Sequence, residues 1–133
     1  MDEATRRKVR DRAGNRCEYC RLKQQHLRLW KHQIEHVIPK KHHGSDDADN
    51  LALACVRCNL AKSSNLAGRD EETGDIVPLF NPRLHEWQEH FGYAGARIAG
   101  RTAIGRVSVD VLNMNEVERL RLRQALLSNG ELD

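Results

Sequence analysis

The sequence predicts an α+β fold: a small zinc-stapled core of two strands and a helix, an N-terminal helix before it and a mostly helical C-terminal extension after it. Two Cys-x-x-Cys pairs, a strand–loop–strand–helix pattern around them and helix-forming segments near both ends support this prediction. A length of 133 residues suits one domain. We therefore expect a single domain over residues 1–133, with the core at 13–66 and the extension at 67–133.

The elements of the core follow from local signals. Residues 3–13 are good helix formers, and Gly14-Asn15 supplies a C-terminal stop. Residues 32–38 have the pattern of a strand that Pro39 ends. A polar loop follows, and residues 50–54 then predict a second short strand. A helix is expected to begin at Cys55.

The extension is patterned less clearly. Residues 76–80 form a short apolar segment, and residues 81–83 place a proline where a helix would begin. Apolar side chains then recur at helical spacing up to Phe91. We expect residues 97–101 to pair as a short strand with the segment before them. Residues 102–112 are ambiguous, and a last helix is expected over 116–128 with Asn115 and Glu118 as a capping box.

Charge is concentrated near the N-terminus. Residues 1–42 hold 12 basic and 5 acidic residues, a net charge of +7, whereas the whole chain carries +3. Such a segment suits a polyanion such as nucleic acid, although an arginine-rich solvated helix face explains it equally well. The sequence has no apolar run long enough to span a bilayer, and its first residues lack a secretory signal. We therefore expect a cytoplasmic protein that does not enter membranes.

The four cysteines predict a structural zinc site. Cys17 and Cys20 form one pair, Cys55 and Cys58 form the other, and a long segment separates the two pairs. Two such pairs complete a tetrahedral shell of four sulfurs, which suits Zn(II) and leaves no open position for a catalytic water. The alternatives are two disulfides or a redox pair. A reducing compartment disfavours the first, and a redox motif needs only one pair.

The segment between the pairs is richer in chemistry than a zinc ribbon requires. Glu35 and His36 lie near the end of the first expected strand, and Asn59 lies in the first turn of the expected helix. Carboxylate and amide oxygens suit Mg(II) or Mn(II). An imidazole that does not coordinate a metal can act as a general base near neutral pH. The sequence therefore predicts hydrolytic chemistry beside the zinc site.

Residues 13–64 resemble the HNH endonucleases that carry flanking zinc cysteines. The resemblance rests on His32-Gln33-Ile34-Glu35-His36-Val37-Ile38-Pro39, on Gly44, on Asn50-Leu51 and on Cys55-Val56-Arg57-Cys58-Asn59-Leu60-Ala61-Lys62, with Asn59 where other members have His. The tail from Thr73 to Arg123 also looks like the C-terminal extension of some small bacterial members. The resemblance implies a ββα-metal, treble-clef-like core that binds one divalent cation, Mg(II), Mn(II) or another.

The resemblance also implies a role for each matching residue. His36 would be the general base, and Asn50 would tie the loop to the hairpin and so orient that base. Glu35 and Asn59 would bind the catalytic cation. Products would carry a 5′ phosphate and a 3′ hydroxyl. The chain departs from the pattern at His43, which stands where the family often has glycine, so His43 would be strained if that position needs a positive φ.

The helix geometry favours a shared site, and the strand geometry sets a condition. Within a helix, Cys55, Cys58, Asn59 and Lys62 lie on an arc of about 100°. Neighbouring strand residues such as Glu35 and His36 point to opposite faces. Both can serve one centre only if the strand is bulged or strongly twisted there, or if the substrate comes between them.

The function expected from these observations is metal-dependent hydrolysis of DNA. We expect the DNA to be double-stranded and the enzyme to act as a monomer or a homodimer. Phosphate contacts are expected from Lys62 and from Arg6, Arg7 and Arg10 in the basic N-terminal segment. One alternative is a non-catalytic zinc-stabilised module that binds nucleic acid through the same surface. Another is a purely structural or protein-binding zinc domain, which would show no salt-dependent DNA binding.

Overall fold

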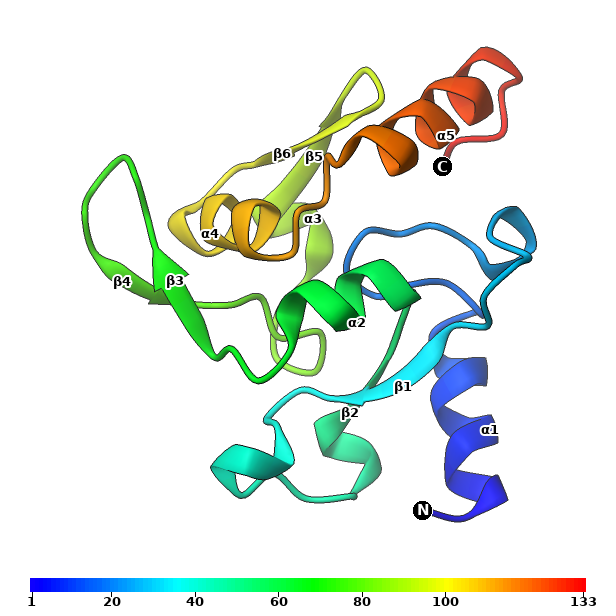
Figure 1. Ribbon diagram of the computed structural model, residues 1–133, viewed down its shortest axis with the longest axis vertical. Coiled ribbons are helices and arrows are strands. Elements are labelled where there is room, and N and C mark those ends of the chain that lie inside the picture. Colours follow the sequence, from blue (N-terminus) through cyan, green and yellow to red (C-terminus); the bar gives the residue numbers. More distant parts are fainter. The chain divides into compact units, whose positions relative to one another are not determined.

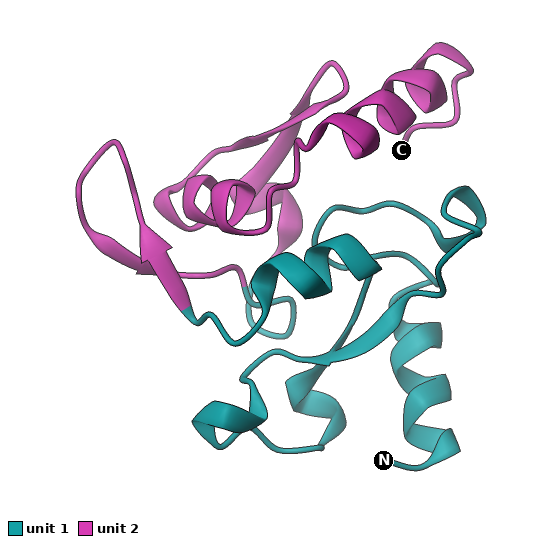
Figure 2. Cartoon of the chain, viewed as in Figure 1, with its two compact units in different colours: residues 1–66, 81–85 teal, residues 67–80, 86–133 magenta.

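The computed structural model describes residues 1–133, and the chain divides into two compact units (Figures 1 and 2). The first unit comprises residues 1–66 and 81–85, and the second comprises residues 67–80 and 86–133. The structure contains five α-helices and three two-stranded sheets, which confirms the α+β class. The expectation of a single domain stays a prediction. None of the helices is both long enough and apolar enough to cross a bilayer.

The first unit is built around one β-hairpin. Its main elements are α1 (Glu3–Arg12), β1 (Gln33–His36), β2 (Leu51–Ala54) and α2 (Val56–Lys62). The strands β1 and β2 are antiparallel, and Gln33 pairs with Ala54 and His36 with Leu51. The order strand, loop, strand, helix is the one that the sequence predicts, and the boundaries fall close to their expected positions.

The two faces of this hairpin receive different partners. On one face, Leu51 and Leu53 form a small buried core with Val9 of α1, and Ile34 packs against it. Helix α1 is otherwise polar, and it is attached to the hairpin by burial of Val9 and by hydrogen bonds from Arg12 to the carbonyls of Ala48 and Leu51. On the other face, Glu35 contacts Lys62 of α2. The hairpin is therefore packed between two helices.

Segment 81–85 belongs to the first unit because of two polar contacts of Glu18. The guanidinium of Arg83 forms an ion pair with Oε1 of Glu18. The other carboxylate oxygen of Glu18 accepts a hydrogen bond from the backbone N–H of Leu53, at 2.8 Å. One glutamate therefore connects this distant segment to strand β2 of the hairpin.

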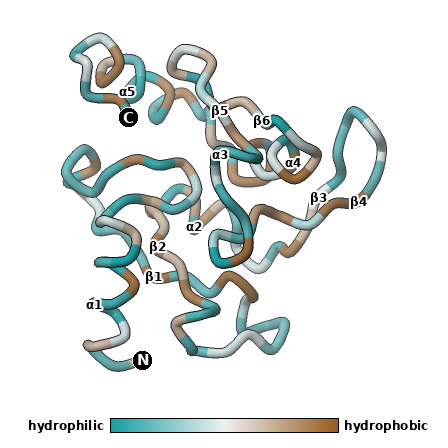
Figure 3. Tube along the Cα trace, turned by 180° about the vertical axis from the view of Figure 1, so that it is seen from behind, coloured by the Kyte–Doolittle hydropathy of each residue, from teal (hydrophilic) through white to brown (hydrophobic).

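The second unit combines two hairpins with helices. Its elements are β3 (Ala67–Arg69), β4 (Ile76–Pro78), α3 (Trp87–His90), β5 (Phe91–Ala94), β6 (Arg97–Gly100), α4 (Ala103–Val111) and α5 (Val117–Ser128). Strand β3 pairs with β4 and β5 pairs with β6, both antiparallel. Hydrophobic residues run along α4 (Figure 3), and the buried Val107 of this helix is part of the unit's core.

Two close packing features hold this unit together. Phe80, Trp87 and Phe91 form a ring cluster with centroid separations of 5.1 Å for both the Phe80–Phe91 and the Trp87–Phe91 pairs. A Cβ atom added to Gly105 would lie 1.9 Å from the carbonyl oxygen of His90, so only glycine lets α4 approach α3 this closely.

Two expectations for the extension are wrong in detail. The helical spacing up to Phe91 predicts one helix from residue 81, but the helix covers only Trp87–His90, and Phe91 begins β5. Pairing of β5 with β6 across the Gly95 turn overrides the helical pattern. The last helix is capped by Glu116 and not by Asn115, because the Asn115 side chain is hydrogen-bonded to the backbone of Ile98.

The second unit contains an ion pair whose effect depends on pH. Hydrogen bonds from Arg106 lower the pKa of Asp70 to about 2, and the nearest contact is 2.9 Å. Because the folded-state pKa lies below the ordinary value of 3.8, the pair stabilises the fold above that pH and its contribution disappears as the pH falls towards 2.

We expect Asp70→Asn to lower the melting temperature at pH 6, and the difference from the wild type to vanish near pH 2. Thermal melting followed by circular dichroism across this range measures it. Asp75→Asn is a matched control, because the Asp75 side chain is exposed and lies outside this ion pair. An equal loss from both substitutions, or a loss that persists near pH 2, would contradict the assignment.

Candidate metal centres and active site

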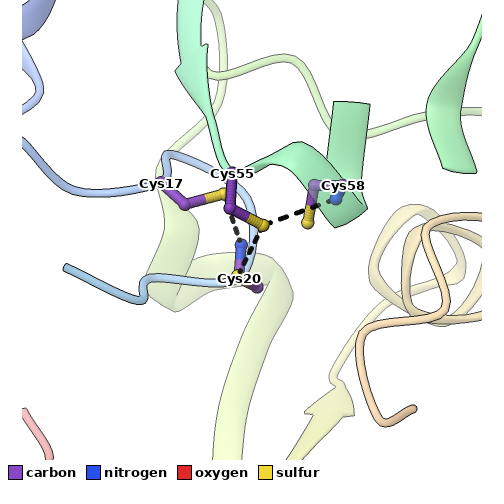
Figure 4. A group of neighbouring side chains, drawn as sticks. All are labelled: Cys17, Cys20, Cys55 and Cys58. Carbon is purple, nitrogen blue, oxygen red and sulfur yellow. Dashed lines mark hydrogen bonds between the residues drawn. The ribbon is translucent and has the colours of Figure 1, made fainter. Parts of the chain in front are cut away.

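Four sulfur atoms converge where the loop after α1 meets the start of α2 (Figure 4). The Sγ atoms of Cys17, Cys20, Cys55 and Cys58 all lie within 4.8 Å of one another. Cys20 and Cys55 are 3.7 Å apart at sulfur. All four side chains are completely buried. The two halves of the site, far apart in sequence, are thus brought together as the cysteine spacing predicts.

This geometry fits a zinc ion. Four sulfurs at about 2.3 Å from a tetrahedral zinc are separated by about 3.8 Å, close to the observed Cys20–Cys55 distance. Backbone N–H groups of Cys20 and Cys58 donate to the sulfurs of Cys17 and Cys55, each at 3.4 Å. Burial raises the pKa of the Cys17 thiol well above its ordinary value, so a thiolate there needs a cation.

A second group of polar side chains lies on the α2 side of the hairpin. Glu35 is only 5% exposed. The Tyr19 hydroxyl donates a hydrogen bond to Oε1 of Glu35, and Nζ of Lys62 lies 3.1 Å from Oε2. Burial raises the pKa of Glu35, although Lys62 and Tyr19 act in the opposite direction. Both carboxylate oxygens therefore have a partner within the protein.

His36 projects from the opposite face of the strand. The pairing of Glu35 with Ala52 and of His36 with Leu51 is continuous, so the strand has no bulge at this point. Nε2 of His36 lies 2.7 Å from Oδ1 of Asp46, and this hydrogen bond lowers the pKa of Asp46. The His36 side chain is 20% exposed. With Nε2 engaged by a carboxylate, Nδ1 is the nitrogen that can accept a proton.

Asn50 fixes the loop between the two strands. Its Oδ1 accepts the N–H of Ile38 at 2.8 Å, and its Nδ2 donates to the carbonyls of Ile38 and Ser45 at 3.0 and 2.9 Å. A Cβ atom on Gly44 would lie 1.6 Å from the Ile38 carbonyl oxygen, so the loop can only close with glycine there. The preceding residue, His43, has a φ of 69°, the left-handed conformation anticipated at this position.

Asn59 lies on α2 opposite the start of β1. Its Nδ2 donates to Oε1 of Gln33, which leaves the amide oxygen available to a cation. Gln33 and Glu35 share a strand face, so Asn59 and Glu35 lie on facing surfaces of α2 and β1. The structure therefore brings Glu35 and Asn59 to the same side of the hairpin. His36 lies on the other side.

The expected phosphate-binding residues differ in their accessibility. Lys62 is 2% exposed, and its ammonium group donates to the carbonyls of His36 and Val37 in addition to its contact with Glu35. A phosphate contact by Lys62 would require release of these bonds. Arg6 and Arg7 are exposed on α1, and Arg10 is half-buried. The arginines are thus better placed than Lys62 to meet a polyanion.

Two partners of the site residues escape the sequence patterns. Asp46 lies in the polar loop that follows β1, and no spacing rule links it to His36. Tyr19 lies inside the first cysteine pair and reaches Glu35 only after the chain folds. A tyrosine between the two cysteines of a Cys-x-x-Cys pair is only a weak sequence signal for a site residue. In the structure, however, Tyr19 is 1% exposed and forms part of the site.

Comparison with known proteins gives consistent results. A family model described as HNH endonuclease matches residues 17–65. The chain is also 24% identical over 123 residues to the Septu protein PtuB of Bacillus thuringiensis, an alignment that covers 91% of this chain and 45% of that protein. The chain thus spans about half the length of the curated relative it matches. No solved structure shows significant similarity.

Proposed function

We propose, from the match of residues 17–65 to the HNH endonuclease family model, that the protein is a metal-dependent endonuclease that hydrolyses phosphodiester bonds of DNA. The observation that carries the proposal is the arrangement of His36, whose Nε2 is held by Asp46 while its Nδ1 remains available. A histidine held in this way is oriented to take a proton from water. The basic N-terminal segment supports a nucleic-acid substrate.

In the proposed reaction, His36 accepts a proton at Nδ1 from the attacking water. The water oxygen forms a bond to phosphorus, and the bond to the 3′ oxygen breaks. The products carry a 5′ phosphate and a 3′ hydroxyl. Asp46 keeps the imidazole in one tautomer and stabilises the imidazolium that forms. Asn50 holds the loop that carries Asp46 close to the end of β1.

A hard divalent cation suits the oxygen donors on the α2 side of the hairpin. Glu35 and Asn59 would hold it, and when bound it would polarise the phosphate and stabilise the leaving oxygen. Glu35 would share its carboxylate with Lys62, since the ammonium group already lies 3.1 Å away. Because Glu35 and His36 lie on opposite faces of β1, the scissile phosphate would have to come between them for both residues to act on it.

The proposal is tested on supercoiled plasmid with the zinc-loaded protein. We expect nicked or linear products with Mg(II), Mn(II) or another divalent cation, and none without an added divalent cation. Binding to the plasmid should weaken steeply as salt is raised. Salt-dependent binding without cleavage under any metal would instead identify a non-catalytic zinc module.

A further prediction concerns Asp46. We expect Asp46→Ala to lower kcat about 10- to 100-fold with little change in KM, because a hydrogen bond to a charged group is lost. The neighbouring Asp47→Ala is the control, because no other residue bonds to its side chain in the structure. Nitrogen-15 NMR of His36 should show the Nε2–H tautomer in the wild type and a mixture in Asp46→Ala. An unchanged tautomer and an unchanged kcat would remove Asp46 from the site.

A further inference from the structure

A basic cavity lies beside the start of β1, within the first unit. It has a volume of about 470 Å³ and is lined by Arg6, Arg10, Trp30, Lys31 and His32, among others. A second cavity of about 500 Å³ shares Arg10 and Lys31 with it and adds Arg28. Both volumes lie within the range of ligand pockets. Neither lining contains an aspartate or a glutamate, so the cavities favour an anion.

The aromatic residue of the cavity is exposed and held in place. Trp30 is 67% exposed, which is unusual for so large an apolar side chain. Its loop is fixed by Gln24, whose side-chain amide donates to the carbonyls of Leu27 and Trp30 at 2.8 and 3.1 Å and accepts the N–H of His32. An exposed indole on a loop held in this way offers a surface on which a base can stack.

Two polar atoms at this cavity have no hydrogen-bond partner. His32 is 1% exposed, and its Nε2 donates to the Leu22 carbonyl at 2.9 Å. Burial lowers the pKa of His32, so the ring is neutral and Nδ1 carries a lone pair. This Nδ1 and the Nη1 of Arg10 are both buried without a partner.

We propose that this cavity binds one unstacked nucleotide, with its phosphate at Arg6, Arg10 and Lys31 and its base on Trp30. The assignment of this nucleotide to the substrate strand rests on the proposed nuclease function. Gln33 lines the cavity and lies on β1, the strand that ends at His36. The cavity thus begins about 10 Å from His36 along the strand.

The experiment measures binding by quenching of tryptophan fluorescence, without added divalent cation so that no strand is cut; of the two tryptophans, Trp30 is exposed and Trp87 is buried. The probes are a short oligothymidylate, an abasic deoxyribose-phosphate oligomer of equal length, thymidine monophosphate and inorganic phosphate. We expect the oligothymidylate to bind about tenfold or more tightly than the abasic oligomer, because base stacking on an aromatic side chain adds affinity.

The variants separate stacking from charge. Trp30→Ala should abolish the preference for bases, measured by anisotropy of a labelled probe, whereas Trp30→Phe should retain it. Arg6→Ala should weaken both oligomers equally. Leu29→Ala is the matched control, because Leu29 is 91% exposed and does not line the cavity. Equal affinity for base-bearing and abasic oligomers, or equal effects of Leu29→Ala and Trp30→Ala, would overturn the proposal.

The remaining probes identify the source of the nucleotide. Quenching by thymidine monophosphate alone, with the same dependence on Trp30, would assign the cavity to a free nucleotide. Quenching by the oligomer at far lower concentration would assign it to a strand. If the protein binds the oligomer in this way but cuts no plasmid under any metal, the nucleotide-binding proposal holds and the proposed nuclease function is wrong. If the protein cuts plasmid but binds base-bearing and abasic oligomers equally, the nuclease function holds and the nucleotide-binding proposal is wrong.

Discussion

Replacing His36 with alanine is expected to lower the single-turnover rate of DNA cleavage by about 10²- to 10⁴-fold, the contribution of a positioned general base. The fold should be unaffected. The imidazole is hydrogen-bonded to Asp46, and the backbone carbonyl of His36 remains available to Lys62. Zinc content and DNA affinity should therefore match the wild type, so that the loss lies in the chemical step.

The measurement is the rate of nicking of supercoiled plasmid at saturating protein, with zinc content determined in the same preparation. His42→Ala is a suitable control, because His42 is an exposed histidine in the segment between β1 and β2. Its Nε2 lies 3.1 Å from the carbonyl oxygen of Ser64. We expect this control to cleave within a few-fold of the wild type. Undiminished cleavage by purified His36→Ala protein would exclude His36 as the base.

Removing zinc is expected to unfold the first unit. The four cysteines connect the loop after α1 to the start of α2, and the apolar cluster that joins α1 to the hairpin is small, formed by the buried Val9, Leu51 and Leu53. Structural zinc supplies about 10–16 kcal/mol of binding free energy in zinc-finger peptides, which is folding free energy when the site does not preform. Few aliphatic contacts here can offset such a loss.

Hydrogen exchange read by mass spectrometry measures the effect. After zinc is stripped by a strong chelator, we expect protection to disappear in β1, β2 and α2, while α4 keeps its protection because it belongs to the second compact unit, with Phe80, Phe91 and Val107 buried in it. Adding zinc back should restore protection, and Cys58→Ser should behave like the stripped protein. Unchanged protection of β1 and β2 in zinc-free protein would show that the cysteines are not a structural metal site.

Several features of the first unit can be predicted from the sequence because short-range patterns specify them. Paired cysteines predict their own convergence, and the structure confirms it. Pro39 ends the extended segment that contains β1, and β2 is apolar along its length (Figure 3) and buried at every residue. These signals act within a few residues and do not depend on how distant segments pack.

The environments of the site residues are less predictable. The sequence leads us to expect a cation at Glu35, and the structure gives this carboxylate Lys62 and Tyr19 as partners. One partner lies near the end of α2 and the other inside the first cysteine pair, both far from β1 in the sequence. Pairing between such distant residues is set by tertiary packing, which no local pattern encodes. The same reason explains the helix wrongly expected up to Phe91, where pairing with Gly100 decides the outcome.

The most direct test of the account asks whether a hard cation binds at Glu35 despite the neighbouring Lys62. The measurement is the titration of Mn(II) into zinc-loaded His36→Ala protein with duplex DNA, with free Mn(II) followed by electron paramagnetic resonance. We predict one Mn(II) per chain, bound about tenfold or more weakly after a further Glu35→Gln substitution. No bound Mn(II), or an affinity that Glu35→Gln leaves unchanged, would contradict the proposed catalytic centre.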